Sequence, residues 1–514
     1  MNSSIVIRVD ASLHMGSGHV MRCATLAEEL RLRGAAITFI CRELPGNYID
    51  WLRTQQFEVL SLAVAVCGET TDAAVSPPHL AWLGVPLEQE LAEVCTLLAE
   101  RPAADWIIVD HYALEARWEQ AARAFAHQIM VIDDLADRAH DCNVLLDQNY
   151  YHDMQRRYDG LLSSACLTLL GPGHALLRNE FAHWRAQCGP RGAAVRRVLV
   201  FFGGVDADNY TMPAIAALAR ANRPDIQVDV VIGTRHPARA AIEAVCLQHG
   251  FTCHIQTSRM AELMAAADLA IGAGGTATWE RCSLGLPALT LCVADNQRQL
   301  VEDAALGGLV YAPEIGPGPE LEERLLNHYI SLLDNPGLRQ FLSHQSHAVV
   351  DGRGAARVAR KLGMCSIVLR TASETDSANL MRWRNDESIR AVSRNSAPIP
   401  LENHQRWLAG LLADPQRILL IGQQRDGQPV GVVRFDLAQS SAEVSIYLVP
   451  GTQKRGQGTE LLAGAEQWLR NMRSDITIIR AEVLGDNQPS HRLFLAADYV
   501  RNSTTYFKKV LQHD

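Results

Sequence analysis

Short apolar runs alternate with stretches of helical spacing over the first part of the chain. The segment 19–33 carries apolar positions at helical intervals and ends at Gly34, a residue type that favours a helix C-terminus. Nearly continuous apolar strands separated by helices are typical of a parallel sheet that is covered on both faces. The pattern predicts a first α/β domain, to about residue 189, with strands at residues 5–10, 37–41, 106–110 and 128–134.

A second cycle of the same kind follows the Gly- and Pro-containing segment 189–193. It closes with a helical tail over residues 336–362. Two successive α/β domains suggest paired Rossmann-like halves with a ligand between them, because open α/β sheets bind ligands beyond the carboxyl ends of their strands. The apolar runs that predict strands in this second domain are residues 197–204, 227–232, 252–255, 268–272 and 287–293.

The hydrophobic period changes after Met364, and strands now follow one another directly. Asp426-Gly427 is a hairpin-turn sequence between two of them. The expected strands are residues 367–371, 417–423, 430–437, 442–450 and 476–484, with two more near Tyr499 and Tyr506, and the expected helices are 378–384, 404–412, 456–472 and 488–496. This mixture predicts an α+β domain, so we expect three domains, at residues 1–189, 190–364 and 365–514.

Composition and charge place the chain among ordinary globular proteins. Its 514 residues are too many for one core, and 48% of them are hydrophobic and 20% charged. The net charge of −9 provides no general attraction for nucleic acid. No apolar run approaches the roughly 20 residues that span a bilayer, and no signal peptide is expected. The 12 cysteines form no Cys-x-x-Cys motif and indicate a reducing cytoplasm.

Three glycines, Gly272, Gly274 and Gly275, fall where an apolar strand turns into a helix. Such a turn presents backbone N–H groups and the positive end of a helix dipole to an anion, most plausibly a phosphate. A tight turn without a ligand is the competing interpretation. Glu280, one turn into the helix, and the polar tripeptide 295–297 after the next strand favour the ligand-binding interpretation.

A second glycine-bearing loop follows the first strand and leads into His19. Gly16 and Gly18 let the backbone turn closely there, and Arg22 lies one helical turn further on. The helix dipole disfavours a positive charge on a side chain at this position, so His19 suits a general base that activates water. A histidine that only makes first-turn hydrogen bonds is the alternative.

Taken together, these motifs resemble the UDP-sugar hydrolases of pseudaminic acid biosynthesis, the PseG family. The resemblance covers roughly residues 1–360 and rests on segments 8–11, 16–22, 109–112, 133–134, 272–280 and 295–297. It implies a GT-B fold of two Rossmann-like domains, related to the glycosyltransferase of peptidoglycan lipid II synthesis. It also implies inverting, metal-free cleavage of UDP-2,4-diacetamido-2,4,6-trideoxy-β-L-altropyranose to UDP and the free sugar.

By this resemblance His19 is the base that deprotonates water. Gly274, Gly275 and Thr276 would hold the pyrophosphate, and Glu280 the ribose hydroxyls. The other expected substrate-binding residues are Gly16, Gly18, Arg22, Asp110, His111, Gly203, Gly204, Asn296 and Gln297. The sequence Asp206-Ala-Asp208 imitates a metal motif but is interpreted as a polar loop and N-cap. A true glycosyltransferase, with a sugar acceptor in place of water, is the alternative function.

The third domain resembles the GNAT superfamily of N-acetyltransferases over residues 366–510. Its Gln-x-x-Gly-x-Gly motif, which lies between a strand and a long helix, implies binding of the acetyl-CoA pyrophosphate. By this resemblance the acetyl-CoA contacts are Gln453, Arg455, Gly456, Gly458, Thr459 and Asn487. Glu443, Tyr447 and Glu482 are candidates for the acid and base, although each could equally belong to a polar pair on a solvated face. Phe494 stands where many relatives carry a catalytic tyrosine, and Tyr499 or a water is a substitute.

We therefore expect an α/β GT-B hydrolase fused to an α+β GNAT domain, cytoplasmic and metal-free. Its substrates would be a UDP-linked amino sugar and acetyl-CoA, and its partners would include further nonulosonate-pathway enzymes, but neither nucleic acid nor membrane. The second activity would acetylate the 4-amine of UDP-4-amino-4,6-dideoxy-N-acetyl-β-L-altrosamine. Alternatives for the third domain are acetylation of a protein N-terminus or nucleotide binding alone. Candidate sugar contacts there are Trp383, Arg384, Asn385 and Trp407, the two tryptophans being more readily interpreted as core.

Overall fold

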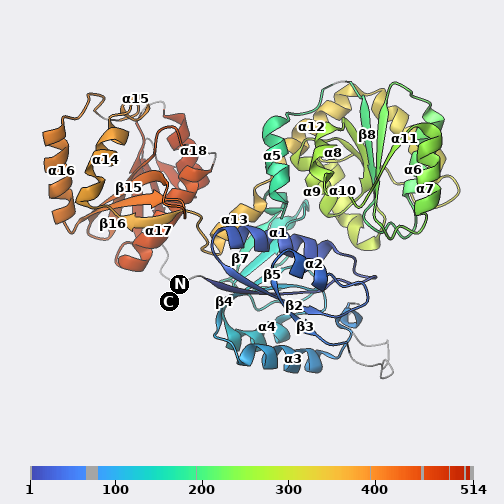
Figure 1. Ribbon diagram of the computed structural model, residues 1–514, viewed down its shortest axis with the longest axis horizontal. Coiled ribbons are helices and arrows are strands. Elements are labelled where there is room, and N and C mark those ends of the chain that lie inside the picture. Colours follow the sequence, from blue (N-terminus) through green and yellow to red (C-terminus); the bar gives the residue numbers. More distant parts are fainter. Residues whose placement is uncertain are drawn as a thin grey trace. The chain divides into compact units, whose positions relative to one another are not determined.

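The computed structural model describes residues 3–64, 79–192, 194–393, 395–452, 456–484, 487–502 and 505–509. The chain divides into two compact units, Met1–Val358 and Ala359–Asp514. The first unit contains two parallel sheets and the second contains one mixed sheet (Figure 1). The expected sequence of two Rossmann-like domains and an α+β domain is therefore present.

The first sheet has seven parallel strands in the order β3-β2-β1-β4-β5-β6-β7. They are β1 (Ser4–Val9), β2 (Ala36–Arg42), β3 (Glu58–Leu62), β4 (Ala104–Asp110), β5 (Ala126–Ile132), β6 (Val144–Asp147) and β7 (Leu167–Leu170). Helices α1 (Gly18–Leu32) and α2 (Ile49–Thr54) cover one face, and α3 (Leu87–Ala99) and α4 (Ala116–Ala122) cover the other (Figure 1). The sequence pattern did not predict β3, β6 and β7; β3 is half-exposed, and β7 is exposed at its first two residues.

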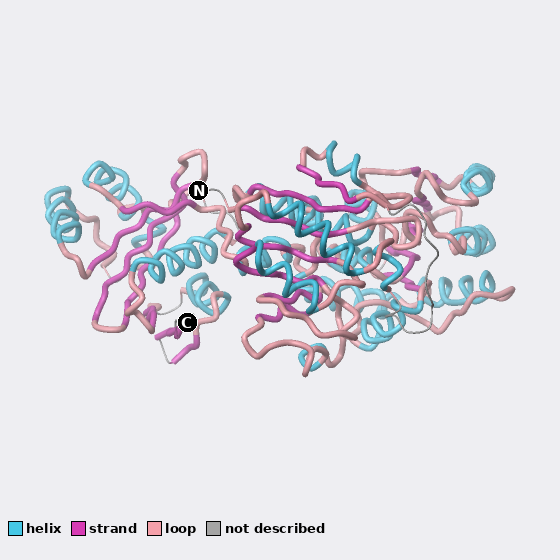
Figure 2. The backbone as a smooth tube through the Cα atoms, turned by 90° about the horizontal axis from the view of Figure 1, so that it is seen from below, coloured by secondary structure: helices cyan, strands magenta, loops and turns pink. Residues whose placement is uncertain are grey.

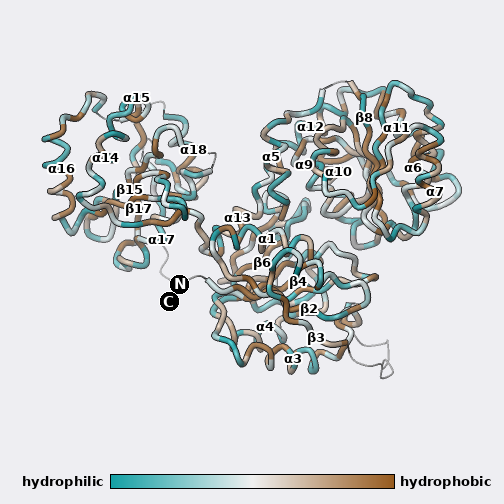
Figure 3. The backbone as a smooth tube through the Cα atoms, in the orientation of Figure 1, coloured by the Kyte–Doolittle hydropathy of each residue, from teal (hydrophilic) through white to brown (hydrophobic). Residues whose placement is uncertain are grey.

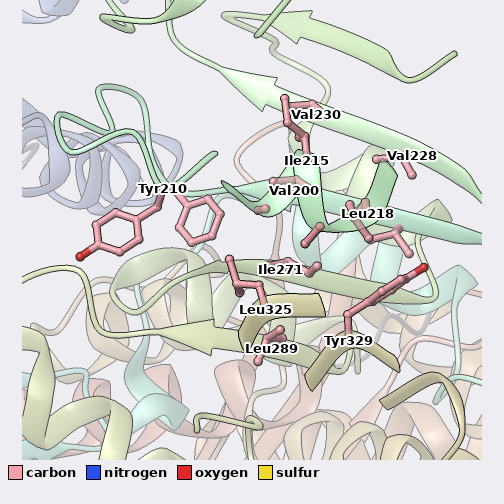
Figure 4. Close-up of a cluster of buried hydrophobic side chains, with 14 of the residues drawn as sticks. Val200, Tyr210, Ile215, Leu218, Val228, Val230, Ile271, Leu289, Leu325 and Tyr329 are labelled. Atoms are coloured by element: carbon pink, nitrogen blue, oxygen red, sulfur yellow. The ribbon is translucent and has the colours of Figure 1, made fainter. Parts of the chain in front are cut away.

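The second sheet has five parallel strands in the order β10-β9-β8-β11-β12, and each was predicted. They are β8 (Arg197–Phe201), β9 (Gln227–Ile232), β10 (Thr252–Ile255), β11 (Leu269–Ala273) and β12 (Ala288–Leu291). On one side lie α6 (Thr211–Ala221), α7 (Arg239–His249) and α11 (Leu321–Leu333); on the other lie α8 (Met260–Ala266), α9 (Thr276–Ser283), α10 (Arg298–Leu306) and α12 (Pro336–Val349) (Figure 1). Figure 4 shows Val200, Ile215 and Ile271 packed in the core between the sheet and the first group of helices.

The segment after β7 packs onto the second sheet rather than the first. It includes α5 (Asn179–Gln187), whose Phe181 is fully buried in one cluster with Tyr151, Met264 and Trp279. Near the end of the unit, α13 (Gly354–Lys361) begins against the backbone of Ala175, where a Cβ on Gly354 would lie 2.1 Å from the Ala175 carbonyl oxygen. The two Rossmann-like domains are thus joined by buried apolar contacts within one unit. The compact unit ends at Val358, inside α13, whereas we placed the domain boundary at residue 364.

The second unit is a mixed sheet with the order β13-β14-β15-β16-β17-β19-β18. Strands are drawn in magenta in Figure 2. The strands of this sheet are β13 (Val368–Thr371), β14 (Arg417–Gln423), β15 (Pro429–Ala438), β16 (Ser441–Leu448), β17 (Ile478–Glu482), β18 (Val500–Asn502) and β19 (Thr505–Lys509). Its helices are α14 (Ser377–Arg384), α15 (Glu387–Arg390), α16 (Leu401–Ala413), α17 (Gln457–Met472) and α18 (Gln488–Ala496). Only β16 and β17 pair in parallel.

The hydrophobic residues are concentrated on the strands and on the inner faces of the helices (Figure 3). In the second unit, α17 buries Leu461 and Ala465 against Phe435 and Ile479 of the sheet. This distribution follows from the period-two and period-3.6 patterns of the sequence. It leaves the loops at the strand ends to carry the polar side chains discussed next.

Candidate active sites

His19, Arg22 and Asp110 form a buried cluster at the centre of the first sheet. Asp110 ends β4, and His19 and Arg22 lie in the first turns of α1, which follows the neighbouring strand β1. Nδ1 of His19 is 2.6 Å from Asp110 Oδ1, and Arg22 donates to both carboxylate oxygens at 2.7 Å. The strand order reverses its direction between β1 and β4, which is the position where open α/β sheets bind ligands.

The carboxylate of Asp110 is held in its ionised form. Burial alone would raise its pKa, but the guanidinium of Arg22 and the ring of His19 outweigh burial and hold the pKa well below its usual range. An ionised carboxylate only accepts hydrogen bonds, so Nδ1 of His19 carries the shared proton. In the neutral form of the ring Nε2 is then the acceptor nitrogen, and within the described residues it has no hydrogen-bond partner.

A second carboxylate, Asp134, completes the cluster. It accepts hydrogen bonds from Arg22 Nη1 at 3.0 Å, from the Tyr112 hydroxyl at 2.5 Å and from Asn149 Nδ2 at 3.2 Å. Its pKa is lowered, because Arg22 and these donors outweigh the effect of burial. Asp134, Tyr112 and Asn149 were not predicted from the sequence to be site residues. Each of the three lies two residues beyond the end of one of the adjacent strands β4, β5 and β6, and this shared position at one edge of the sheet is the pattern that links them.

A group of three aromatic rings, Tyr112, Trp82 and His79, lies beside His19. The His19 ring meets Tyr112 edge-on at a centroid distance of 4.7 Å, and Tyr112 contacts Trp82 at 5.6 Å and His79 at 5.3 Å. Burial lowers the pKa of His79. Aromatic faces of this kind pack against the apolar faces of sugar rings. None of these three rings was identified as a site residue from the sequence.

His111 takes a different place from the one expected for a substrate contact. Its side chain is fully buried, with Nε2 3.5 Å from Asp10 Oδ2 and Nδ1 accepting from the Ala113 N–H at 3.1 Å. Burial lowers the pKa of His111 to about 4. The reason is the period of the chain, since successive side chains at the end of β4 point to opposite faces. Asp110 therefore faces His19, whereas His111 faces the buried charges beneath the first loop.

The loop between β1 and α1 leaves open space beside its glycines. Gly16 has a φ of +72° and donates to the Ser12 carbonyl oxygen at 2.9 Å. A Cβ placed on Gly16 or Gly18 would meet no atom within 4 Å. Gly16 is therefore required by its backbone conformation and not by internal packing. The open space next to His19 is compatible with a bound substrate.

In the second sheet, the two central strands β8 and β11 each end in a glycine pair. Gly203, with a φ of +110°, and Gly204 follow β8. The Gly204 carbonyl lies so close to the end of β9 that a Cβ on Gly233 would be 1.9 Å from its oxygen. Asp206 accepts hydrogen bonds from the N–H groups of Tyr210 and Thr211, at 3.0 and 2.8 Å, although Tyr210 and not Asp206 is the N-cap residue of α6. The carboxylate of Asp206 thus holds the start of this helix.

The turn after β11 presents the backbone of Gly274 and Gly275 at the start of α9. A Cβ on Gly274 would lie 2.3 Å from Val301 Cγ2, and Gly275 has a φ of +126°. The side chain of Gln297 lies across the turn, and its Oε1 is buried without a hydrogen-bond partner in the described part of the chain. Thr276 begins α9. The side chain of Asn296 lies outside the described residues.

Glu280 lies one turn into α9 and is 15% exposed. Its Oε1 is 3.5 Å from Nη2 of Arg178, and Glu180 is a further neighbour. Burial raises the pKa of Glu280, and the positive charge of Arg178 opposes that effect. A carboxylate with one distant cation and an accessible edge can accept hydrogen bonds from a vicinal diol, which is what a ribose presents.

In the second unit, β16 and β17 separate part-way along their length. Their ladder pairs only three residues of each strand and ends at Glu443 and Arg480, although β16 continues to Leu448. Tyr447 lies on this unpaired part of β16; burial raises its pKa, and Arg384 opposes the rise. Glu443 and Glu482 are exposed at the ladder and at the end of β17. Of the three candidates, Tyr447 is therefore the one that lies on the part of β16 that β17 does not pair with.

Helix α17 begins at Gln457, and its N-cap residue Gly456 has a φ of +93°. Gly458 and Thr459 lie in its first turn, and a Cβ on Gly458 would touch Leu493 of α18 at 3.4 Å. Gln453 and Arg455 lie outside the described residues. Asn487 caps α18, its side chain accepting from the Ser490 N–H at 3.2 Å. The side-chain oxygen of Asn487 thus caps the N-terminus of α18, and the side-chain NH₂ group is the part that can donate to a ligand.

The aromatic residues of this unit divide between core and surface. Phe494 is buried against Tyr499, whose hydroxyl is also buried and has Glu466 of α17 as its charged neighbour. Trp383 is 5% exposed and belongs to the core, as expected. Trp407 is 37% exposed, which corrects its interpretation as core. Trp383 also lines a pocket of about 460 Å³ that opens beside Thr452, just before the predicted pyrophosphate loop.

Within the described residues, no group of three or more His, Cys, Asp or Glu side chains is arranged to hold a metal ion. None of the helices in the described ranges combines the length and the apolar character needed to cross a membrane.

Comparison with known proteins identifies two parts of the chain. Residues 197–326 match the glycosyltransferase family 28 C-terminal domain, and residues 378–499 match the acetyltransferase (GNAT) family. The second Rossmann-like domain is thus of the glycosyltransferase type, in a two-domain GT-B architecture, and the second unit is a GNAT acetyltransferase domain. The expected fold class is confirmed.

Individual relatives are more distant. The chain is 21% identical over 504 residues to the uncharacterized protein MJ1062 of Methanocaldococcus jannaschii, a match that covers 95% of each chain. It is 30% identical over 168 residues to the spore coat polysaccharide biosynthesis protein SpsG of Bacillus subtilis, covering 32% of this chain and about half (48%) of that protein. The crystal structure of Acinetobacter baumannii MurG covers 70% of this chain and 99% of its own, with 13% identity and a TM-score of 0.47.

Proposed function

We propose that the first unit hydrolyses a UDP-linked sugar, with His19 as the general base. The observation that carries this proposal is the 2.6 Å contact between His19 Nδ1 and Asp110, which leaves Nε2 as a proton acceptor beside open space. Nε2 takes a proton from water as the water oxygen attacks the anomeric carbon. The bond between that carbon and the phosphate oxygen breaks, and UDP departs with its electron pair.

The second sheet supplies the nucleotide site in this proposal. The N–H groups at Gly275 and Thr276 stabilise the charge that develops on the departing pyrophosphate, and the dipole of α9 adds to this effect. Gly274 donates its own N–H to the Leu291 carbonyl oxygen at 3.0 Å, and its lack of a side chain lets the turn pass close to Val301. Gln297 lies at the same turn, and the NH₂ group of its side chain can donate to a phosphate oxygen. Glu280 accepts hydrogen bonds from the ribose hydroxyls. No metal is required, because the amides and the dipole already provide the positive potential.

The second unit, in this proposal, transfers the acetyl group of acetyl-CoA to a primary amine. The gap where β16 and β17 separate receives the thioester, and the start of α17 at Gly456 binds the pyrophosphate of the coenzyme. Tyr447 borders this gap and is the best placed of the three candidate acid and base residues. It would protonate the departing thiolate, since burial keeps its hydroxyl protonated.

The two activities fit consecutive steps on one compound. We propose that the second unit acetylates the 4-amine of UDP-4-amino-4,6-dideoxy-N-acetyl-β-L-altrosamine, and that the first unit then hydrolyses the resulting UDP-2,4-diacetamido-2,4,6-trideoxy-β-L-altropyranose in pseudaminic acid biosynthesis. The SpsG relative, named for polysaccharide biosynthesis, supports a role in sugar metabolism.

A glycosyltransferase is the second candidate function of the first unit. The match of residues 197–326 to a glycosyltransferase family domain favours it, because that family is named for the transfer of sugars. Binding of the sugar donor by this domain would be the same for both functions. The two candidates differ only in whether water or a sugar hydroxyl attacks. The test is incubation of the purified chain with the UDP-amino sugar, with and without acetyl-CoA, following UDP and CoA separately.

Release of CoA followed by acetyl-CoA-dependent release of UDP, with free sugar as the second product, would support both proposed steps. UDP release that requires an added sugar acceptor would indicate a transferase. If CoA never appears, the second unit does not use this amine. A His19→Ala chain should lose UDP release and keep CoA release.

A further inference from the structure

Asn149 connects the two Rossmann-like domains of the first unit. It follows β6 of the first sheet, and its Oδ1 accepts from Trp279 Nε1 of α9 at 2.9 Å. Its Nδ2 donates to Asp134 Oδ2 at 3.2 Å. Trp279 is fully buried and Asn149 is 7% exposed, so water does not compete for either hydrogen bond.

The orientation of the Asn149 amide is fixed by its two partners. An indole N–H can only donate, and an ionised carboxylate can only accept. The carbonyl oxygen of Asn149 must therefore face Trp279, and its NH₂ group must face Asp134. No other residue type of this size offers an acceptor and a donor in that arrangement, so the position is specified by hydrogen bonding and not by volume alone.

From Asp134 the connection continues to the proposed base. Asp134 holds Nη1 of Arg22 at 3.0 Å, and the other edge of the same guanidinium grips Asp110 through two hydrogen bonds of 2.7 Å. Asp110 in turn orients the His19 ring. Because a guanidinium is planar and rigid, rotating it to follow Asp134 rotates the plane in which Asp110 is held.

At its other end the connection reaches the nucleotide turn. Trp279 lies in the first turn of α9, which begins at Thr276, and it belongs to one buried cluster with Met264, Ala270 and Leu300. A helix packed in this way moves as a rigid element. The nucleotide turn at its N-terminus therefore cannot shift without displacing the indole of Trp279.

We infer that Asn149 is a positioning residue that sets the His19 side chain in register with the helix that binds the nucleotide. The inference rests on the proposed function and deepens it: the group that binds the leaving nucleoside diphosphate also fixes where the base points. Neither Asn149 nor Trp279 touches the reacting atoms. Their effect is on the catalytic step and not on the affinity for the nucleotide.

The test uses the full-length chain with Asn149→Ala, Trp279→Phe and the double variant. Trp118→Phe is the matched control, because Trp118 is equally buried and its indole N–H has no partner among the described residues. We expect kcat for UDP release to fall by roughly 10- to 100-fold in Asn149→Ala, as small misplacements of a catalytic group do. The Kd for UDP alone should stay within about twofold of wild type.

The double variant separates a connected pair from two independent defects. If Trp279 acts through Asn149, the double variant is no slower than Asn149→Ala alone. Multiplicative losses, an unchanged kcat in Asn149→Ala, or a UDP affinity that falls in step with kcat would each overturn the inference. Trp118→Phe should leave kcat and UDP affinity unchanged.

A measurement that needs no turnover distinguishes this inference from the proposed function. In NMR spectra of the chain with ¹⁵N-labelled histidine, Trp279→Phe should shift the His19 ring signals, assigned with His19→Ala, and Trp118→Phe should not. A shift without any UDP release by the wild-type chain would refute the hydrolase and leave the connection intact. No shift would refute the connection whatever the activity.

Discussion

Nδ1 of His19 lies 2.6 Å from the carboxylate of Asp110, although the two residues are 91 positions apart in the chain. Arg22 donates hydrogen bonds to both oxygens of that carboxylate, and its positive charge keeps Asp110 ionised in a buried site. The pair is the arrangement by which a carboxylate orients an imidazole for proton transfer. The activity of the first unit should therefore depend on the His19–Asp110 pair and on the loops around it.

Replacing Asp110 by Asn should slow UDP release by about 10²- to 10⁴-fold, because an amide can present a donor to Nδ1 and stabilise the wrong tautomer of His19. Asp105→Asn on the same strand is the matched control, since Asp105 only accepts from the Ser4 N–H at 2.8 Å. Steady-state UDP release measures the effect, and CoA release by the same sample reports on folding of the second unit. A loss of less than threefold in Asp110→Asn would contradict the assigned role.

Replacing Gly275 by Ala should weaken binding of UDP by about tenfold or more. The φ of +126° at Gly275 is unfavourable for a residue with a Cβ, and relief of that strain would rotate the N–H groups of the turn. Calorimetric titration with UDP measures the affinity. Gly250→Ala, at a φ of +71° in a helix C-cap, should carry comparable strain without changing UDP affinity. Equal affinities in all three chains would exclude this turn as the nucleotide site.

Replacing Gly456 by Ala should raise the KM for acetyl-CoA by about tenfold, with little change in UDP release. Gly456 has a φ of +93° where α17 begins, so a side chain there would displace the N–H groups offered to the coenzyme. Gly427→Ala provides the control, because Gly427 has a φ of +87° in a hairpin turn. An unchanged KM in Gly456→Ala would place the coenzyme elsewhere.

Acid should destabilise the first domain through Glu90. This carboxylate is buried between Arg8 and Arg42; burial would raise its pKa, but the two guanidiniums lower it to about 2 from an ordinary 4.5. A lowered acid pKa stabilises the fold above pH 4.5 and loses that contribution, of about 3 kcal/mol, as the pH falls towards 2.

Glu90→Gln should therefore lower the free energy of unfolding at pH 7 by about 3–5 kcal/mol, since it leaves two buried guanidiniums without their shared carboxylate. The difference from wild type should shrink below pH 4.5. Urea unfolding at pH 7 and pH 3 measures both values, and Glu88→Gln, an exposed position on the same helix, should change neither. A difference that stays constant with pH would refute the buried-charge explanation.

His111 should contribute to acid sensitivity in a higher pH range. Burial lowers its pKa to about 4 from an ordinary 6.5, so the unfolded chain binds a proton that the folded chain does not. The free energy of unfolding should fall as the pH decreases from 6.5 to 4, by about 3 kcal/mol from this group. His111→Asn should flatten that slope in urea titrations, whereas His127→Asn at an exposed position should not. Parallel slopes in all three chains would contradict the prediction.

Much of the fold was predictable because its signals are local. The apolar runs of β8 and β11 are nearly continuous, and the glycines after them need backbone conformations that other residues avoid. The strands β6 and β7 were missed, and β7 is exposed at its first two residues, so that it shows no continuous buried run. β3 was missed because it is half-exposed along its length.

The sequence by itself determined the number of α/β and α+β domains, the glycine turns and the position of His19 at a helix start. These are properties of neighbouring residues, set by side-chain period and backbone freedom. Only the tertiary structure decided that Asp110 faces His19 while His111 is buried, and that Asn149 meets Trp279 across 130 positions. Such partners are chosen by strand order and helix packing, and contacts between distant segments leave no periodic trace in a single sequence.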